Sequence, residues 1–278
     1  MSATLARAFR HRSFAIGAVL TGIVVLAALL SLVWTPWSAT ELAVPRKLRP
    51  PSAEHLFGTD HFGRDILSMV MVGARNSIVV GVVAVAIGCS AGTALGLLAA
   101  ARRGWTEELV MRFSDFTFAF PAILSAIMIT ALLGPGTVNS ILAIGIFNVP
   151  VFARLTRGAA LGLWRRDFVA AARLAGRGEL AIATSHVIPN LMSLIIVQVT
   201  VQFALAILAE AGLAYLGFSA QPPDPSWGRM LNEAQTFLFL APQLAILPGL
   251  CIALSVLGLN LLGDGLRDLL DPKLRRLR

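Results

Sequence analysis

The sequence predicts an all-α integral membrane protein with six transmembrane helices. Of its 278 residues, 56% are hydrophobic and only 14% are charged, and the mean hydropathy is +0.77. A soluble domain carries roughly a quarter charged residues. Apolar runs long enough to cross a bilayer recur along the chain. Most of the 23 lysines and arginines fall in alternate connections between these runs, as the positive-inside rule requires.

The first apolar run covers residues 14–35 and follows a basic segment, residues 1–13. It is longer than the ~7–15-residue apolar core of a signal peptide. Trp34 and Trp37 at its far end are typical of a membrane interface. We therefore expect a first transmembrane helix, with the N-terminal segment in the cytoplasm.

Residues 36–75 are polar and rich in proline, and we expect them to be extracytoplasmic. They contain the string FGTDHFGRD, whose glycines and aspartates are typical of turns and of helix caps. The residues of interest in it are Gly58, Thr59, Asp60, Gly63, Arg64 and Asp65. We expect this string to lead into the second transmembrane helix.

Residues 76–264 are expected to hold five further transmembrane helices. The predicted spans are 77–101, 113–133, 138–155, 191–213 and 244–262. Gly88, Gly92 and Gly96 recur every four residues, which predicts a face where another helix approaches closely. Pro150 predicts a kink in the fourth span.

Two further segments complete the predicted topology. The loop at residues 216–243 is expected outside and contains SAQPPDPSWGRML, in which Ser226 can cap a short helix at the membrane surface. The tail at residues 265–278 ends in basic residues and is expected in the cytoplasm. Both termini are then cytoplasmic.

The cytoplasmic connection at residues 158–189 contains a short amphipathic stretch. Asp167 is predicted to be its N-cap, Gly176 its C-terminal stop, and Pro189 the opening of the next helix. Helical spacing places an apolar face on one side, formed by Phe168, Ala171, Ala172 and Ala175. The opposite side holds Arg166, Ala170, Arg173 and Arg177. Such a helix suits docking to a protein outside the bilayer, and an ordinary interfacial helix is the alternative.

Three polar residues fall in the fifth predicted span: Gln198, Gln202 and Glu210. Polar groups inside a membrane are costly and usually face a cavity or a partner helix. We predict that these side chains line a translocation path. Hydrogen bonding between helices of the same subunit is the alternative.

Four motifs resemble those of ABC importer permeases. The pattern AA-x-x-x-G followed by H-x-x-P resembles the EAA loop of that family, and its residues here are Ala171, Ala172, Gly176, His186 and Pro189. GTD-x-x-GRD, QPP-x-PSWG and the DGLRD-containing tail resemble the second, "C"-type permease subunit of dipeptide/oligopeptide/nickel-type importers. One departure is Ala170, which stands where the family has a glutamate and puts a role for that carboxylate in doubt.

The resemblance extends from about residue 14 to 275 and implies the type I ABC importer permease fold, in the bacterial inner membrane, with a cytoplasmic coupling helix. It implies that the residues coupling transport to the ATPase are Asp167, Phe168, Ala170, Ala171, Ala172, Arg173, Gly176, His186 and Pro189. The implied partners are a homologous second permease subunit, two ABC ATPase subunits, an extracytoplasmic solute-binding protein and membrane lipid.

The implied function is to form half of a path for di- or oligopeptides, driven by ATP. Nickel chelates, glutathione or another small solute are alternative cargoes. A stand-alone secondary transporter is an alternative of another class. A sequence of that class is expected to contain intramembrane charge pairs and internal inverted repeats. A regulatory or assembly subunit that moves nothing is a further one.

Several motifs are absent from the sequence. Its only lysines are Lys47 and Lys273, and neither ends a P-loop, so we expect no cofactor on this chain and ATP with Mg²⁺ on partner subunits. The four histidines lack paired metal-ligand spacing, so no metal site is expected. Tyr215 and the scattered serines form no grouping of a nucleophile with a base, so no catalytic residue is expected. The basic residues form no recognition helix for nucleic acid.

Overall fold

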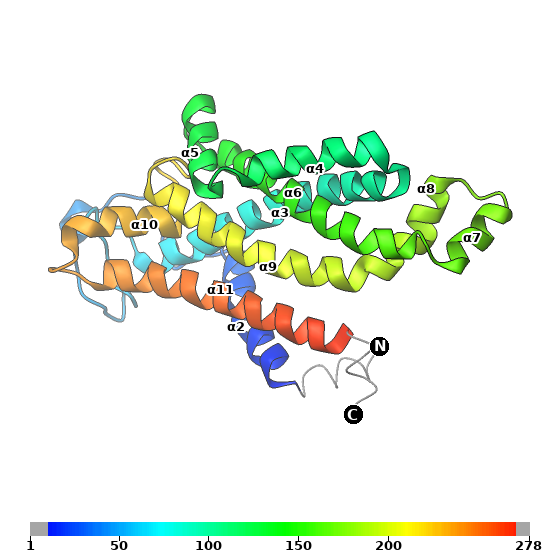
Figure 1. The fold of residues 1–278 in the computed structure, drawn as a ribbon. Coiled ribbons are helices and arrows are strands. Elements are labelled where there is room, and N and C mark those ends of the chain that lie inside the picture. The colour runs from blue at the N-terminus through cyan, green and yellow to red at the C-terminus, as the bar shows by residue number, and fades with distance from the viewer. Residues whose placement is uncertain (1–10, 271–278) are drawn as a thin grey trace.

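The computed structural model describes residues 11–270 as helices joined by turns and loops (Figure 1). The elements are α2 (Arg12–Leu30), η1 (Val44–Arg46), α3 (Ile66–Arg102), α4 (Gly104–Phe118), α5 (Ala122–Leu133), α6 (Thr137–Leu163), α7 (Asp167–Leu174), α8 (Glu179–Ile182), η2 (Ala183–Val187), α9 (Ile188–Tyr215), α10 (Trp227–Ala234), η3 (Gln235–Phe237) and α11 (Gln243–Leu270). Most of the predicted N-terminal segment 1–13 and the basic end of the predicted tail lie outside the described residues.

Five helices among residues 11–270 are long and apolar enough to cross a membrane. They are α2, α3, α6, α11 and the run Glu179–Tyr215, in which α8, η2 and α9 follow one another directly. The helices α4 and α5 add a sixth candidate when they are counted as one broken span. The six predicted spans therefore all have a helical counterpart.

The second span begins earlier than the sequence predicted. Helix α3 starts at Ile66, so the end of the predicted outer segment 36–75 is helical. Asp65 caps this helix, because its Oδ2 accepts a hydrogen bond from the Ser68 N–H at 2.8 Å. The polar pair Arg75 and Asn76 interrupts the apolar run and hid the first turns of the helix from the hydropathy pattern.

The third predicted span, 113–133, is wrong as a single straight helix. The chain bends by 89° between α4 and α5. Pro121 occupies the N-cap position of α5, and a proline disfavours helical geometry in the residue before it, which favours a break between α4 and α5. Salt bridges from Glu107 to Arg157 and from Asp115 to Arg154 hold α4 against α6.

The close helix contact predicted from the three glycines is confirmed. A Cβ atom on Gly88 would lie 2.1 Å from the Asn148 Cβ, and one on Gly92 would lie 2.4 Å from the Val149 carbonyl oxygen. A Cβ on Gly96 would meet a carbonyl oxygen of α6 at 2.5 Å. The α3–α6 pair is therefore packed backbone against backbone, as small-residue repeats allow.

Two helices also extend further than predicted. Helix α6 ends at Leu163 instead of near residue 155, and it contains Pro150 in its interior. Helix α11 reaches Leu270, so the first part of the predicted tail 265–278 is helical. The predicted loop 216–243 lies between α9 and α11, with α10 capped by Ser226 inside it, and its position outside the membrane stays a prediction.

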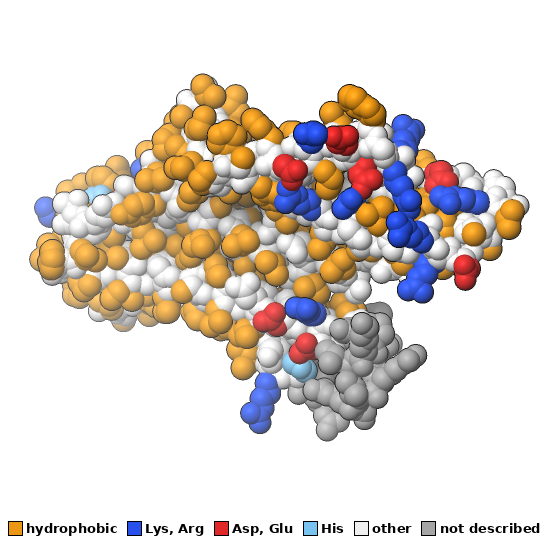
Figure 2. Space-filling view, in the orientation of Figure 1, with side chains coloured by type: hydrophobic (Ala, Val, Ile, Leu, Met, Phe, Trp, Pro, Cys, Tyr) orange, Lys and Arg blue, Asp and Glu red, His pale blue; other side chains and the backbone are white. Residues whose placement is uncertain are grey.

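The molecule has two distinct ends (Figure 1). Helices α7 and α8 project at one end, which we call the docking end. Helix α10 and the segment before α3 lie at the other, which we call the α10 end. Charged side chains gather over α4, α6 and the docking end, and a smaller group lies at the lower edge, at the start of α2 and the end of α11, whereas the face between these groups and the α10 end is mostly hydrophobic (Figure 2).

Candidate functional site

Helix α7 at the docking end begins one residue earlier than predicted. Arg166 occupies the N-cap position with extended backbone and no side-chain cap hydrogen bond. Asp167 is the first helical residue, so the prediction that it caps the helix is wrong. Its carboxylate lies in the first turn, where the helix dipole favours a negative charge. Ala170 is consequently the fourth helical residue, outside the capping-box position.

The buried side of α7 also differs from the prediction. Val169 is fully buried and Ala172 nearly so, in one apolar cluster with Ile182 of α8. Of the predicted apolar face, only Ala172 is buried, because the helix is turned so that Val169 points inward. The outward side carries small or apolar residues that solvent can reach, Phe168, Ala171, Leu174 and Ala175. We call this outward set the docking face.

The C-terminal stop at Gly176 is confirmed. Its φ of +76° lies in the left-handed region that favours glycine. The Gly176 N–H donates to the Arg173 carbonyl at 2.9 Å, and the Arg177 N–H donates to the Ala172 carbonyl at 3.1 Å. These two bonds form a Schellman motif, which ends α7 sharply and sends the chain back toward α8.

Side chains of the loop fasten α7 to its surroundings. The Arg173 Nε donates to Glu179 Oε1 at 2.9 Å, and the Arg173 guanidinium lies 5.5 Å from the centre of the Trp164 ring. The rings of Phe168 and His186 are 6.1 Å apart. Pro189 lies in the first turn of α9, as predicted, although the helical run already begins at Glu179. The loop is therefore an ordered unit.

The GTD-x-x-GRD string forms a buried ionic cluster at the α10 end. Asp60 Oδ1 accepts from the N–H groups of Phe62 and Arg64, and Asp60 Oδ2 accepts from Arg64 Nε at 2.6 Å. The Arg64 guanidinium also donates to Glu233 Oε2 in α10 at 2.5 Å. The Arg229 Nε donates to Glu233 Oε1 at 2.8 Å. The cluster therefore ties the first outer segment to the second outer loop.

Burial raises the pKa of Glu233, but hydrogen bonds and charges from Arg229 and Arg64 outweigh it. The pKa of Glu233 therefore lies below its ordinary value. The carboxylate stays ionised at neutral pH and holds both guanidinium groups.

The other residues of the string shape the loop around this cluster. Thr59 is buried, and its hydroxyl donates to the Arg46 carbonyl and accepts from the Arg49 N–H. Gly58 and Gly63 both have a φ of +80°, and a Cβ on Gly63 would overlap the backbone of residue 43. The turn chemistry expected of this string is thus present.

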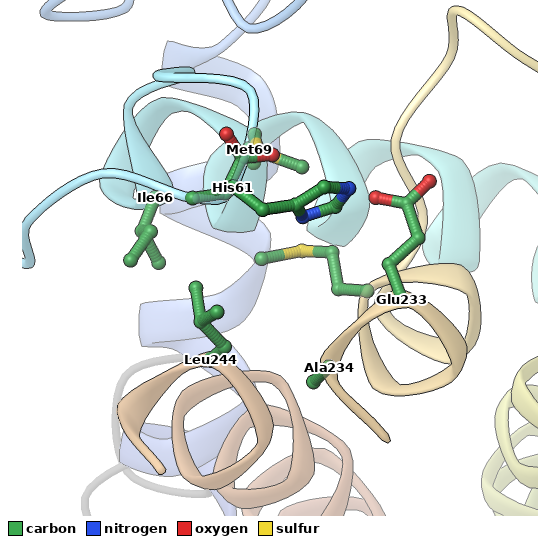
Figure 3. A pocket seen from close by; sticks show the side chains of 8 residues that line it. His61, Ile66, Met69, Glu233, Ala234 and Leu244 are labelled. Atoms are coloured by element: carbon green, nitrogen blue, oxygen red, sulfur yellow. The ribbon is translucent and has the colours of Figure 1, made fainter. Parts of the chain in front are cut away.

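Asp60, His61 and Glu233 also place possible metal ligands within 4.8 Å of one another. The His61 ring points toward the Glu233 carboxylate across a small pocket (Figure 3). Asp60 and Glu233 already share the positive charge of Arg64, so a divalent cation here would meet that charge at short range. The cluster is an internal ion-pair network. The predicted lack of a metal site stays a prediction.

The candidate path residues lie apart along α9. Gln202 is buried, and its Nε2 donates to Asn148 Oδ1 in α6 at 2.7 Å. Glu210 is 1% exposed and accepts hydrogen bonds from Ser77 in α3 and from Ser219 beyond α9. Gln198 is half-buried. The bonds of Gln202 and Glu210 stay within the subunit, as the alternative interpretation expects, and a role in a path stays a prediction.

Sequence analysis did not single out two residues that bind the predicted site residues: Asn148, the partner of Gln202, and Glu233, the partner of Arg64. Asn148 was detectable as a further polar residue inside an apolar span. Glu233 carried no local signal, because its partner Arg64 lies 169 residues away in the chain.

The sequence comparisons decide the family. Residues 92–276, well over half of the chain, match the family described as "Binding-protein-dependent transport system inner membrane component". The chain belongs to this family. It is also 45% identical over 271 residues to a glutathione transport system permease protein (GsiD) of Escherichia coli, covering 97% of this chain and 89% of that protein. The same figures hold for the GsiD protein of Shigella sonnei. The GsiD protein of Pectobacterium atrosepticum is 42% identical over 263 residues, covering 93% of this chain and 87% of that protein.

Family and structure together define the class of protein. The chain is a permease subunit of an ABC importer, of the type associated with peptides, with an all-helical type I permease fold. Its five or six apolar helices make it a multi-pass inner-membrane protein. The family depends on a binding protein and on other transporter subunits. A transporter that works alone does not fit this family.

Proposed function

We propose that this subunit forms half of the translocation path of an ATP-driven importer and receives the driving motion through α7. The observation that carries the proposal is the docking face, which projects from the apolar body on an ordered loop (Figure 1). Leu174 is 91% exposed there. A small, exposed helix face fits the groove of another protein, in the way that amphipathic helices are commonly recognised.

The proposed partners follow from the family. Two ABC ATPase subunits would hold ATP and Mg²⁺, and one of them would receive α7. A homologous permease subunit would supply the other half of the path, and a solute-binding protein would deliver the cargo at the α10 end. This arrangement places the docking end and both termini in the cytoplasm, in accordance with the positive-inside rule.

The proposed cargo is a short peptide. Glutathione is the most specific candidate within this class, because it is a tripeptide and relatives that share 45% identity are glutathione transport permeases. Longer peptides and nickel chelates are the other cargoes to be compared.

The test is ATPase activity of the complex purified in lipid nanodiscs, after co-expression of this chain with its genomic neighbours. The binding protein is added alone, with glutathione, with a dipeptide and tripeptide mixture, and with nickel–histidine. We expect peptides or glutathione to raise the rate several-fold above the binding protein alone.

The outcomes separate class from cargo. Stimulation by glutathione only would narrow the cargo to that tripeptide. Stimulation only by nickel–histidine would contradict the peptide cargo and leave the importer. If no ATPase co-purifies with the chain, coupling through α7 is wrong.

A further inference from the structure

Helix α9 links the two ends of the molecule. Its N-terminal end continues from α8 and η2, and Ile182 and Val187 there are fully buried in the same apolar cluster as Val169 of α7. Its C-terminal end lies beside α10 (Figure 1). A continuous helix transmits displacement along its axis, so the attachment at the far end decides where a movement of α7 is delivered.

Glu210 makes that attachment through polar contacts. Its carboxylate is 1% exposed and has no ion-pair partner among residues 11–270. The Ser77 hydroxyl of α3 donates to Oε2 at 3.1 Å, and the Ser219 hydroxyl donates to Oε1 at 3.3 Å. One side chain thus joins α9 to α3 and to the loop leading to α10. A buried polar group without its partners is strongly disfavoured, so these contacts hold the elements in one arrangement.

Close packing surrounds this point. A Cβ on Gly228 of α10 would lie 2.0 Å from the carbonyl oxygen of Ala211, the residue after Glu210. Asn232 Nδ2 donates to the Tyr215 carbonyl at 2.8 Å. The buried Trp227 donates from Nε1 to the Val70 carbonyl in α3 at 3.0 Å. The first two of these contacts tie α10 to the end of α9 and the third ties it to α3, which leaves little room for α9 to slide past α10.

We propose that Glu210 is a positioning residue that locks the far end of α9 to α3 and to the loop leading to α10, so that movement of the docking loop reaches the α10 end. The inference rests on the proposed function and assigns Glu210 a role other than contact with cargo. Helix α10 carries Glu233, so the movement would also reach the ionic cluster around Arg64.

The test uses the complete complex in nanodiscs and compares Glu210→Ala with Glu210→Gln. Glutamine can accept from one serine hydroxyl and donate to the other, so it keeps both contacts. We expect E210A to lose at least fivefold of the stimulation by loaded binding protein while the basal ATPase rate stays within twofold. E210Q should keep at least half of the stimulation.

A second measurement follows amide hydrogen exchange in α10 (Trp227–Ala234) with and without a non-hydrolysable ATP analogue. We expect the nucleotide to change exchange in the wild type and in E210Q and to leave it unchanged in E210A. Ser77→Ala with Ser219→Ala supplies the same test if E210A does not assemble. Ser255→Ala is the matched control, because among residues 11–270 this buried hydroxyl donates to the Cys251 carbonyl of its own helix, α11.

Three results would overturn the inference. Stimulation of E210A within twofold of the wild type would show that the attachment is dispensable. An equal fall of basal and stimulated rates would show a purely structural role. Equal losses in E210A and E210Q would point to the charge itself. A wild-type complex that holds no ATPase would contradict the proposed function and remove the basis of the inference with it.

Discussion

The Arg64 guanidinium lies 2.5 Å from Glu233 Oε2 and joins two outer segments that are 169 residues apart in the chain. Arg64 is 5% exposed and also pairs with Asp60. Removing one member of a buried ion pair leaves its partner charged and unpaired, which costs far more than loss of an exposed pair.

We therefore expect Arg64→Ala to lower the free energy of unfolding by about 3 kcal/mol. The measurement is unfolding in mixed detergent micelles. Arg112→Ala is the matched control, because its pair with Glu108 is exposed to solvent and such pairs contribute little to stability. Equal effects of the two substitutions would contradict a structural role for the cluster.

The same cluster predicts a dependence of stability on acid. The pKa of Glu233 is lower in the folded protein than its ordinary 4.5, so the folded state favours the ionised form. Its contribution is complete above about pH 4.5 and is lost as the pH falls toward the folded value. Stability measured between pH 6 and pH 3.5 should fall less steeply in Glu233→Gln than in the wild type. Parallel curves for the two proteins would refute this.

The glycine at the end of α7 gives a prediction about coupling. Gly176 has a left-handed φ with open space around it, so a side chain there strains the backbone without a steric clash. We expect the Gly176→Asp protein to insert and assemble normally but to show at least tenfold lower ATP-driven uptake. The left-handed backbone conformation costs a residue with a side chain about 1–2 kcal/mol, and this strain distorts the turn that orients α7. Gly178→Asp is the matched control, since Gly178 has an ordinary negative φ and equally open surroundings. Normal uptake by Gly176→Asp would count against coupling through α7.

The contact between α3 and α6 predicts a loss of stability. A Cβ on Gly92 would lie 2.4 Å from the Val149 carbonyl oxygen. Because that oxygen belongs to the backbone of α6, the two helices would have to move apart to relieve the overlap. We expect Gly92→Ala to lower the free energy of unfolding by about 1–3 kcal/mol, the usual range for overpacking. Gly158→Ala in α6, where nothing lies within 4 Å, should be neutral or slightly stabilising. A neutral Gly92→Ala would contradict the close approach.

Much of the fold could be predicted because its signals are local. Hydropathy located the spans, the repeat of Gly88, Gly92 and Gly96 located a packing face, and Ser226 marked the start of α10. Gly176 marked the end of α7 for the same reason, since few other residues adopt its backbone conformation.

The mistaken predictions concern features that no local pattern fixes. The rotation of α7 depends on how Val169 fits the cluster with Ile182, and helical spacing alone allowed more than one buried side. The bend between α4 and α5 depends on Pro121 and also on the packing of α4 against α6, which lies far along the chain from the start of α4. In the same way, Asp167 is a residue type that commonly caps helices, but its backbone is already helical and Arg166 occupies the N-cap position.

The sequence by itself determined a membrane protein of the ABC permease class, its apolar spans and the residues that begin and end several helices, because these follow from composition and short-range chemistry. Only the tertiary structure decided which polar groups meet. Arg64 donates a hydrogen bond to Glu233, Gln202 donates one to Asn148, and Glu210 accepts one from Ser77. These partners are far apart in the chain and are brought together by helix packing, which is a property of the whole fold.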